Sequence, residues 1–290
     1  MKKADLHLHT TASDGTDSIE QRLEQASNQG LDGIAITDHD TINQELEKRT
    51  KIADNGVELI SGAEVKCEIN NTGIEILGYF IDPKGEEIHR MFDRLENFRR
   101  ARMEEMIYRL DGDLNIKLSY EDVKETANGP IGRPHLAKTL AEEGVVETPN
   151  QAFNDFIGES SSYYVETEKL EAKEVISKIH ANGGVTSLAH PGRDLTKENA
   201  DEIINELIDE GLDAIEVPYT YQDKIEKGYN INFGVKHAKK LADKYNLLMT
   251  GGSDCHGSQT DKYNIGKINL RYEHVEKLRD LADQYQSSRY

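Results

Sequence analysis

The strongest constraint on the fold of this chain is the regular alternation of short apolar runs with amphipathic segments. Runs such as GIAIT (33–37), LDAIEVPY and NLLMTGGSD are typical of buried strands, and stretches with helical periodicity separate them. SIEQRLEQASNQG has the pattern of a surface helix that ends at Gly30. Because strands that alternate with helices favour parallel pairing, this pattern predicts a parallel α/β barrel or sheet.

One pair of strands departs from this alternation. The runs VELISGAEVKCEI and GIEILGYFI (73–81) are separated only by a turn around Asn70, Asn71 and Thr72. A connection this short is typical of a hairpin, so these two strands are expected to pair with each other.

The middle of the chain has a different pattern. Between about Lys84 and Ser162 the sequence contains no convincing strand, and its apolar residues recur at helical spacing. Helices are predicted over 86–111, 119–127, 133–144 and 150–157. We therefore expect a helical insertion, residues 84–162, in a barrel formed by residues 1–83 and 163–290.

Histidines and carboxylates follow the predicted strands at their carboxyl ends, which is where parallel α/β folds build their sites. His7 and His9 alternate at the end of the first strand, so both side chains face the same side. The complete set is His7, His9, Asp14, Asp38, His39, Glu64, His190, Asp254 and His256. Imidazole with carboxylate is a ligand set for zinc, manganese or iron(II). Because the set is too large for one ion, two or three ions are expected, with Glu64 as the shared ligand.

Six short blocks together resemble a known family. In chain order they are DLHLHT, SDGT, TDHDT, GAEV, AHPG and SDCHG, and they are similar to the PHP (polymerase and histidinol phosphatase) superfamily. The helical insertion and the block IGRPHLAKTL (131–140) resemble the subgroup of small metal-dependent phosphoesterases that act on nucleoside 3′,5′-bisphosphates or trim short RNA from its 5′ end. The resemblance implies a distorted (β/α)7 PHP barrel with up to three metals in its mouth.

The resemblance also implies an assignment of ligands to ions. It gives the first metal His7, His9, Glu64 and Asp254, the second Glu64 and His190, and the third Asp14, His39 and His256. The family usually has a histidine in the strand before LGYFID, where this chain has Glu75. Because a carboxylate is a harder ligand than imidazole, Glu75 favours Mn²⁺, with Fe²⁺ or Zn²⁺ as alternatives.

Three cationic side chains are candidates for binding phosphate or assisting catalysis. They are Arg133 and His135 in GRPH, and Arg193 in AHPGR. An arginine offers a planar fork that matches phosphate oxygens, although Arg133 could instead begin a helix and pair with surface acids. Two acids are open to different interpretations: Asp38 could orient an imidazole or cap a helix, and Glu216 could face the barrel mouth, cap a helix or lie on the surface.

The composition limits the binding partners and the cellular location that are expected for this chain. With 54 acidic and 35 basic residues the net charge is −19, so the surface repels nucleic acid in general and double-stranded DNA is not expected to bind. No apolar run approaches the roughly 18 residues of a membrane span, so no membrane association is expected. The two cysteines, Cys67 and Cys255, make no disulfide framework, and a reducing cytoplasm is the expected location.

Together these features predict a hydrolase of phosphate esters. The expected substrates are small phosphorylated nucleotides, 3′,5′-bisphosphates such as pAp and the 5′ ends of short RNA, which a metal-bound hydroxide attacks at phosphorus. Two alternatives stay open: a histidinol-phosphate phosphatase and a metal-binding PHP module without catalysis. The oligomeric state does not follow from the sequence.

Overall fold

The computed structural model describes residues 1–114, 116–127, 129–268 and 270–288. It divides into two compact units, one formed by Met1–Met91 with Leu170–Tyr290 and the other by Phe92–Lys169. Each unit has its own cluster of buried apolar side chains. Among the described residues, no helix combines the length and the apolar character needed to cross a membrane.

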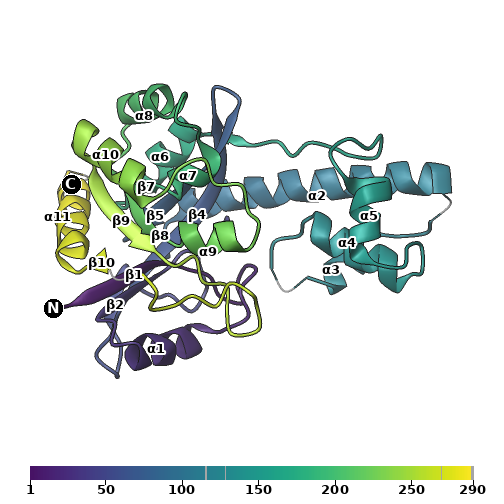
Figure 1. Cartoon of the computed structure of the whole chain (residues 1–290). Coiled ribbons are helices and arrows are strands. Elements are labelled where there is room, and N and C mark those ends of the chain that lie inside the picture. The colour runs from purple at the N-terminus through teal and green to yellow at the C-terminus, as the bar shows by residue number, and fades with distance from the viewer. Residues whose placement is uncertain (115, 128, 269, 289–290) are drawn as a thin grey trace. The chain divides into compact units, whose positions relative to one another are not determined.

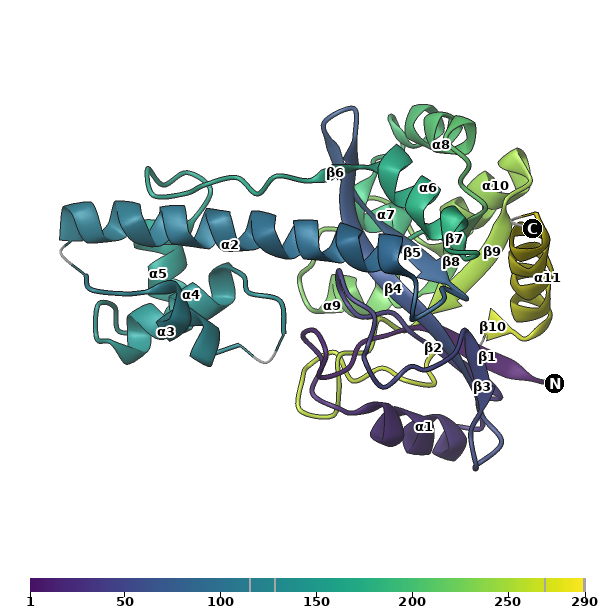
Figure 2. The same ribbon diagram turned by 180° about the vertical axis from the view of Figure 1, so that it is seen from behind.

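The first unit is built on a ten-stranded sheet with the strand order β10-β1-β2-β4-β5-β7-β8-β9. Its strands are β1 (Lys3–Leu8), β2 (Gly33–Ile36), β3 (Thr50–Ile52), β4 (Glu58–Ile69), β5 (Thr72–Tyr79), β6 (Leu170–Glu171), β7 (Val185–Leu188), β8 (Ala214–Tyr219), β9 (Leu248–Gly252) and β10 (Leu270–Arg271). The short strands β3 and β6 both pair with β4, and Figure 2 shows them beside it. β10, which pairs with β1, is also only two residues long, so seven longer strands form the wall of the sheet.

The sheet curves until its two ends meet. A parallel bridge joins Leu8, at the end of β1, to Cys255, just after β9. Gly252 makes this approach close, because a Cβ atom there would lie 2.2 Å from the Cβ of His7. The expected α/β barrel is therefore confirmed.

Strand direction explains why the barrel is distorted. β1, β2 and β4 are parallel, as are β7, β8 and β9, whereas β5 runs antiparallel to both of its neighbours. Asn70 and Asn71 form the turn before β5 with φ of 49° and 59°, the left-handed conformation that asparagine tolerates well. This tight turn confirms the predicted hairpin and sends β5 back against β4.

Helices surround this sheet on its outside (Figure 1). They are α1 (Ile19–Asn28), α6 (Ala172–Ala181), α7 (Pro191–Asp194), α8 (Ala200–Asp209), α9 (Tyr221–Glu226), α10 (Val235–Tyr245) and α11 (Glu273–Ser287). Ser18 caps the start of α1, where its hydroxyl accepts from the Gln21 amide in a capping box, and Gly30 follows the end of the helix with φ of 67°. The predicted helix and its glycine stop are confirmed.

The second unit is helical in its described residues. α2 (Glu86–Leu114) continues into this unit, and the other elements are α3 (Tyr120–Glu125), α4 (Arg133–Glu142), α5 (Pro149–Ala152) and the π-helical turn η1 (Phe153–Ile157). α2 covers the predicted helix 86–111, and its apolar face, with Met103, Met106 and Leu110, packs on Leu136 and Leu140 of α4. The segment predicted as one helix over 150–157 is instead split between α5 and η1.

Candidate metal centre

The site begins with the two alternating histidines of the first strand. His7 lies in β1 and His9 directly after it, both fully buried, and their ring centroids are 5.3 Å apart. The alternation of side chains along a strand places both rings on one face, as the sequence predicted. That face lies at the carboxyl end of the strand, where the other candidate residues gather.

Glu64 occupies the centre of the group. It lies in β4 and is buried, and its Oε1 is 3.3 Å from Nε2 of His7 and 2.9 Å from Nε2 of His190. Its Oε2 is 3.4 Å from Nε2 of His9 and 3.0 Å from Nδ1 of His39. Although burial opposes ionisation, the nearby His7 and His39 hold the pKa of Glu64 well below its usual range. One ionised carboxylate thus faces four imidazoles.

Asp254 adds a second shared carboxylate in which each oxygen has different partners. Oδ1 lies 3.3 Å from Nε2 of His9 and 3.4 Å from Nδ1 of His256. Oδ2 instead accepts from the Tyr219 hydroxyl at 2.8 Å and from Nζ of the buried Lys224 at 2.7 Å. Only Oδ1 therefore faces the imidazoles of the site.

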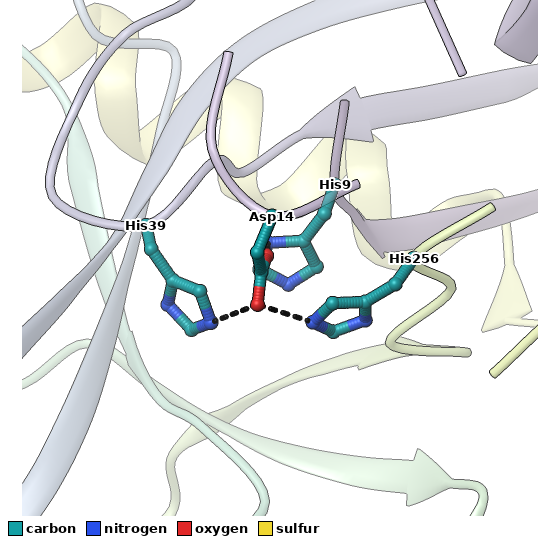
Figure 3. A group of neighbouring side chains, drawn as sticks. All are labelled: His9, Asp14, His39 and His256. Carbon is teal, nitrogen blue, oxygen red and sulfur yellow. Dashed lines mark ion pairs between the residues drawn. The ribbon is translucent and has the colours of Figure 1, made fainter. Parts of the chain in front are cut away.

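A second cluster gathers around Asp14, which is the exposed member of the set (Figure 3). Oδ2 of Asp14 lies 3.8 Å from Nε2 of His39 and 3.3 Å from Nε2 of His256. His9 completes the cluster, with its ring stacked on that of His256 at 4.1 Å. Burial, together with the charges of His256 and His39, lowers the pKa of His9 to about 3, so its imidazole is neutral and can act as a ligand at neutral pH.

Glu75, in β5, lies in the same group. It is buried, and its carboxylate is 3.2 Å from Nε2 of His190 and 3.9 Å from Nδ1 of His39. Arg193 donates to its Oε2, and Nζ of Lys66 lies 3.6 Å from its Oε1. The charges of Arg193 and Lys66 hold the pKa of Glu75 well below its usual range despite burial and the nearby Glu64.

The structure thus brings nine of the sequence-predicted side chains into one connected group. Five subsets have ligand atoms that all lie within 4.8 Å of one another. They are His9–Asp14–His39–His256, His7–Glu64–His190, His7–His9–Asp254, His39–Glu64–Glu75 and Glu75–His190–Asp194. Several groups able to bind a metal ion are therefore present.

The hydrogen-bonding state of these atoms tests whether the residues fit metal ions. Buried ring nitrogens of His7, His9, His39 and His190, and Oε2 of Glu64, have no hydrogen-bond partner among the described residues. Buried polar atoms are normally satisfied, so this concentration of unsatisfied nitrogens and oxygens around one point fits divalent cations as their missing partners. The donor set of imidazole and carboxylate fits the same class of ion.

Two of these residues also have an uncommon backbone conformation. His190 has φ of 24° and Asp254 has φ of 53°, both in the left-handed region that residues other than glycine rarely adopt. Such conformations persist where the surroundings impose them, and they concentrate at functional sites.

Several residues of the site were missed or left open by the sequence. Asp194 places Oδ2 3.1 Å from Nδ1 of His190, and its only signal was its spacing of four residues from that histidine. Glu216 was open between the mouth and other roles; its Oε1 lies 3.2 Å from Nδ1 of His7, and its Oε2 accepts from the His190 amide at 2.8 Å. The structure therefore places Glu216 inside the barrel, against two candidate ligands.

Asp38 has a different role from either of those considered. It accepts hydrogen bonds from the Thr10 amide at 2.7 Å, the Thr10 hydroxyl at 2.6 Å and the Ser13 hydroxyl at 2.6 Å. It therefore braces the loop between His9 and Asp14 rather than a ligand ring or a helix end.

The three cationic candidates fall in different parts of the chain. Arg193 lies beside the ligand group and pairs with Glu75 and Asp194. Arg133 and His135 belong to the second unit, in the first turn of α4, where Arg133 lies 3.2 Å from Glu159 and over the rings of Phe153 and Tyr164. A role of these three residues in binding substrate stays a prediction.

Comparisons with known proteins agree with this architecture. Residues 5–217 match the PHP domain family, and residues 236–260 match the family described as PHP-associated. A 5′-3′ exoribonuclease of Haemophilus influenzae is 30% identical over 256 residues, which cover 88% of this chain and 90% of the relative. A 3′,5′-nucleoside bisphosphate phosphatase of Chromobacterium violaceum is 24% identical, with 92% of this chain and 91% of the relative covered.

Solved structures give the same result. A chain from Bifidobacterium adolescentis, classed as a metal-dependent phosphoesterase, superposes with a TM-score of 0.74 and 30% sequence identity. The alignment covers 97% of this chain and 96% of that chain. The resemblance seen in the sequence motifs is therefore confirmed: this chain belongs to the PHP family, and it is a hydrolase that acts on phosphate esters.

Proposed function

We propose that this chain hydrolyses phosphomonoesters of small nucleotides with the help of two or three divalent cations. The leading substrates are 3′,5′-bisphosphates such as pAp and the 5′ ends of short RNA, the substrate types named for the two relatives above. The observation that carries the proposal is the position of Glu64, whose two oxygens face four imidazoles. Among the described residues, the facing nitrogens of His7, His9 and His39 are buried and have no hydrogen-bond partner. A carboxylate in this position is suited to bridge neighbouring cations.

The contacts support an assignment of ligands to ions. In this assignment His7, His9, Glu64 and Asp254 hold one cation. Glu64, Glu75 and His190 hold a second, and Asp14, His39 and His256 hold a third. The proximity of His9 to the Asp14 cluster supports a role for its ring between the first and third positions. We expect Mn²⁺ in the second position because it has two carboxylates, with Fe²⁺ or Zn²⁺ as alternatives.

The bound cations would supply Lewis acidity, which lowers the pKa of water and neutralises phosphate charge. The chain itself supplies the cationic groups. Arg193, part-exposed beside the ligands, can donate to phosphoryl oxygens through its guanidinium fork. Arg133 and His135 are proposed to bind substrate as well, and His135 can orient the phosphate or protonate the leaving oxygen. The prediction of a cytoplasmic location stands as part of this proposal.

Parallel assays of metal content and turnover test the proposal. The purified chain, loaded with Mn²⁺, is assayed on pAp, histidinol phosphate and a short 5′-phosphorylated RNA, and its metal content is measured by elemental analysis. We expect at least two equivalents of metal and preference for the nucleotide substrates. Faster turnover of histidinol phosphate would support the alternative phosphatase, and full metal content without hydrolysis would support a binding module.

A substitution of the central carboxylate separates the site from nonspecific metal binding. Glu64→Gln should lose more than one equivalent of metal and at least 10³-fold in kcat/KM, because it removes the shared anionic ligand. Glu47→Gln, a change at an exposed glutamate, is the matched control and should alter neither measurement. Full activity and full metal content in Glu64→Gln would overturn the assignment.

A further inference from the structure

A lysine-lined hollow lies on the first unit, outside the ligand group. Its volume is about 400 Å³, and its lining includes Lys197, Phe233, Lys236, His237 and Lys240. In a chain with a net charge of −19, three lysines around one hollow make a local reversal of sign.

These lysines differ from two neighbouring lysines in forming no salt bridge among the described residues, although the charge of Lys197 acts on the adjacent, exposed Glu198. On α10, the helix that carries Lys236 and Lys240, Lys239 pairs with Asp243 and Lys244 pairs with Asp201. Within the part of the chain that the structure describes, no carboxylate lies within 4.0 Å of the ammonium group of Lys197, Lys236 or Lys240. The three charges are exposed and available to an anionic ligand.

Chain direction places this hollow at the rim that carries the ligand group. β8 and β9 are parallel neighbours, so α10, which leads into β9, begins on the side where β8 ends. The segment before α10 is also bonded to the loop that carries His190, because the Asn232 amide donates to the Gly192 carbonyl at 2.8 Å and its side chain donates to the Leu195 carbonyl at 2.9 Å. Asn232, which precedes the hollow-lining Phe233, is therefore hydrogen-bonded directly to the residues that follow His190.

An exposed aromatic ring lies in the segment that leads into the hollow. Tyr229, in the connection from α9 to α10, is 43% exposed. Nζ of Lys224 lies 5.4 Å from the centre of its ring and 2.7 Å from Oδ2 of Asp254. The ring is thus two contacts from a candidate metal ligand. Aromatic rings that alternate with cationic side chains are the pattern of surfaces that bind single-stranded nucleic acid.

From this arrangement we infer that the rim surface formed by Tyr229, Lys197, Lys236 and Lys240 binds the nucleotides of a single-stranded RNA that follow its 5′ end. A base stacks on Tyr229, and backbone phosphates of the following nucleotides enter the lysine-lined hollow. The inference rests on the proposed function for the reacting end of the RNA, but it concerns the length of substrate that the chain holds. This surface gives a protein with a net charge of −19 a local basic site at which a polyanion can bind.

Substrates of two lengths distinguish the contribution of this surface to binding from that of the metal centre. The Mn²⁺-loaded chain is assayed on pAp and on a 5′-phosphorylated pentaribonucleotide, and its affinity for a 2′-O-methyl pentaribonucleotide is measured by fluorescence anisotropy. The variants are Lys197→Ala/Lys236→Ala/Lys240→Ala, Tyr229→Ala and Tyr229→Phe. A second triple variant, Lys51→Ala/Lys84→Ala/Lys277→Ala, removes the same charge from exposed lysines elsewhere.

The expected pattern is specific to the long ligand. The rim triple variant and Tyr229→Ala should each weaken binding of the pentanucleotide about tenfold, raise its KM to the same extent and change the KM for pAp less than twofold. Tyr229→Phe keeps the stacking ring and should behave as the parent, as should the control triple variant. Loss of three phosphate contacts should also reduce the slope of log affinity against log salt by about 2.

Three results would overturn the inference: unchanged pentanucleotide affinity in the rim variants, equal losses for pAp and pentanucleotide, or the same loss in the control triple variant. Because the anisotropy measurement needs no turnover, it decides this inference even if neither substrate is hydrolysed. Absence of hydrolysis with retained, rim-dependent binding would count against the proposed function alone.

Discussion

The guanidinium of Arg22 holds the backbone carbonyl of His9 with two hydrogen bonds, 3.0 Å from Nε and 2.7 Å from Nη2. The same group donates to the carbonyl of Cys255 at 3.0 Å, and Nη1 lies 3.3 Å from Asp17. Arg22 is fully buried, so these contacts are not exchanged for water. One side chain therefore fixes the two loops that carry His9 and His256.

Replacing Arg22 with methionine should disturb both stability and metal binding. It leaves two carbonyls and Asp17 without their donor in the interior, and we expect the free energy of unfolding to fall by about 3 kcal/mol. Metal at the His9–Asp14–His39–His256 cluster should be retained about tenfold less tightly because its two stacked rings lose a common support. Urea unfolding of the metal-free protein and titration with Mn²⁺ measure the two effects.

Gln25→Ala is the control for this prediction, since Gln25 contacts the same guanidinium at 3.1 Å but leaves its bonds to both carbonyls intact. It should lower stability by less than about 1 kcal/mol and leave metal affinity unchanged. Equal effects of the two substitutions would show that Arg22 acts only through general packing.

Glu216 is predicted to strengthen metal binding by His7 through Nδ1, the ring nitrogen that does not face Glu64. Its carboxylate lies 3.2 Å from Nδ1 of His7, which leaves Nε2 directed at Glu64. Burial disfavours the charged imidazole, but Glu64 and Glu216 hold the pKa of His7 well above its usual range in the metal-free protein. Glu216→Gln should weaken Mn²⁺ binding about 10- to 100-fold, as expected when the carboxylate behind a ligand imidazole is removed.

Isothermal titration with Mn²⁺ measures this effect, with the fold judged separately by circular dichroism. Glu216→Asp retains the charge but shortens the reach, and it should give an intermediate affinity. Unchanged affinity in Glu216→Gln would show that Glu216 serves only the backbone amide of His190.

The sequence was informative wherever local rules decide the structure. The alternation of His7 and His9 fixes their common face, and the two asparagines at 70 and 71 fix the hairpin, because both effects act over a few residues. The carboxyl ends of parallel strands then bring most of the distant ligands together without any knowledge of loop structure, whereas Glu75 comes from the antiparallel strand β5.

What the sequence could not show depends on contacts between distant segments. Arg22 lies in an amphipathic helix, where an arginine is expected on the exposed side, yet its partner Cys255 is 233 residues away. The burial of Lys224 could not be predicted from the sequence for the same reason, since it depends on Asp254, which lies 30 residues further along the chain. The π-helical turn η1 shares its apolar periodicity with an ordinary helix, so spacing alone could not distinguish them.

Glu75 should control which metal the site prefers. Its carboxylate stands between His190 and two cationic side chains, Arg193 and Lys66. Glu75→His replaces a hard anionic ligand by a softer neutral one and leaves both cations facing an uncharged ring. We expect the ratio of Mn²⁺ to Zn²⁺ bound from an equimolar mixture to fall about tenfold. Elemental analysis after gel filtration gives the ratio.

Lys66→Met is the control for the charge effect, because it removes one neighbouring cation while the carboxylate stays. It should leave the ratio of Mn²⁺ to Zn²⁺ within about twofold of the parent. An unchanged ratio in Glu75→His would exclude Glu75 as a metal ligand.

Asp5 makes stability depend on pH. It is fully buried below His7 in β1, and burial raises its pKa to about 6 even though the Ser253 amide donates to it at 2.9 Å. Because the folded pKa is above the unfolded value of 3.8, the folded state binds the proton more tightly, and this contribution to stability is lost as pH rises from about 4 to about 6. Asp5→Asn cannot ionise, so it should avoid that loss.

In metal-free protein we therefore expect the stability of Asp5→Asn relative to the parent to increase by about 2–3 kcal/mol between pH 4 and pH 8, which corresponds to a shift of about two pKa units. Urea unfolding at a series of pH values measures the difference, and Asp54→Asn, at an exposed position, should show no such trend. The sign is decisive: a relative stability that falls as pH rises would mean that the folded protein favours the charged carboxylate, and that burial is not the dominant influence on Asp5.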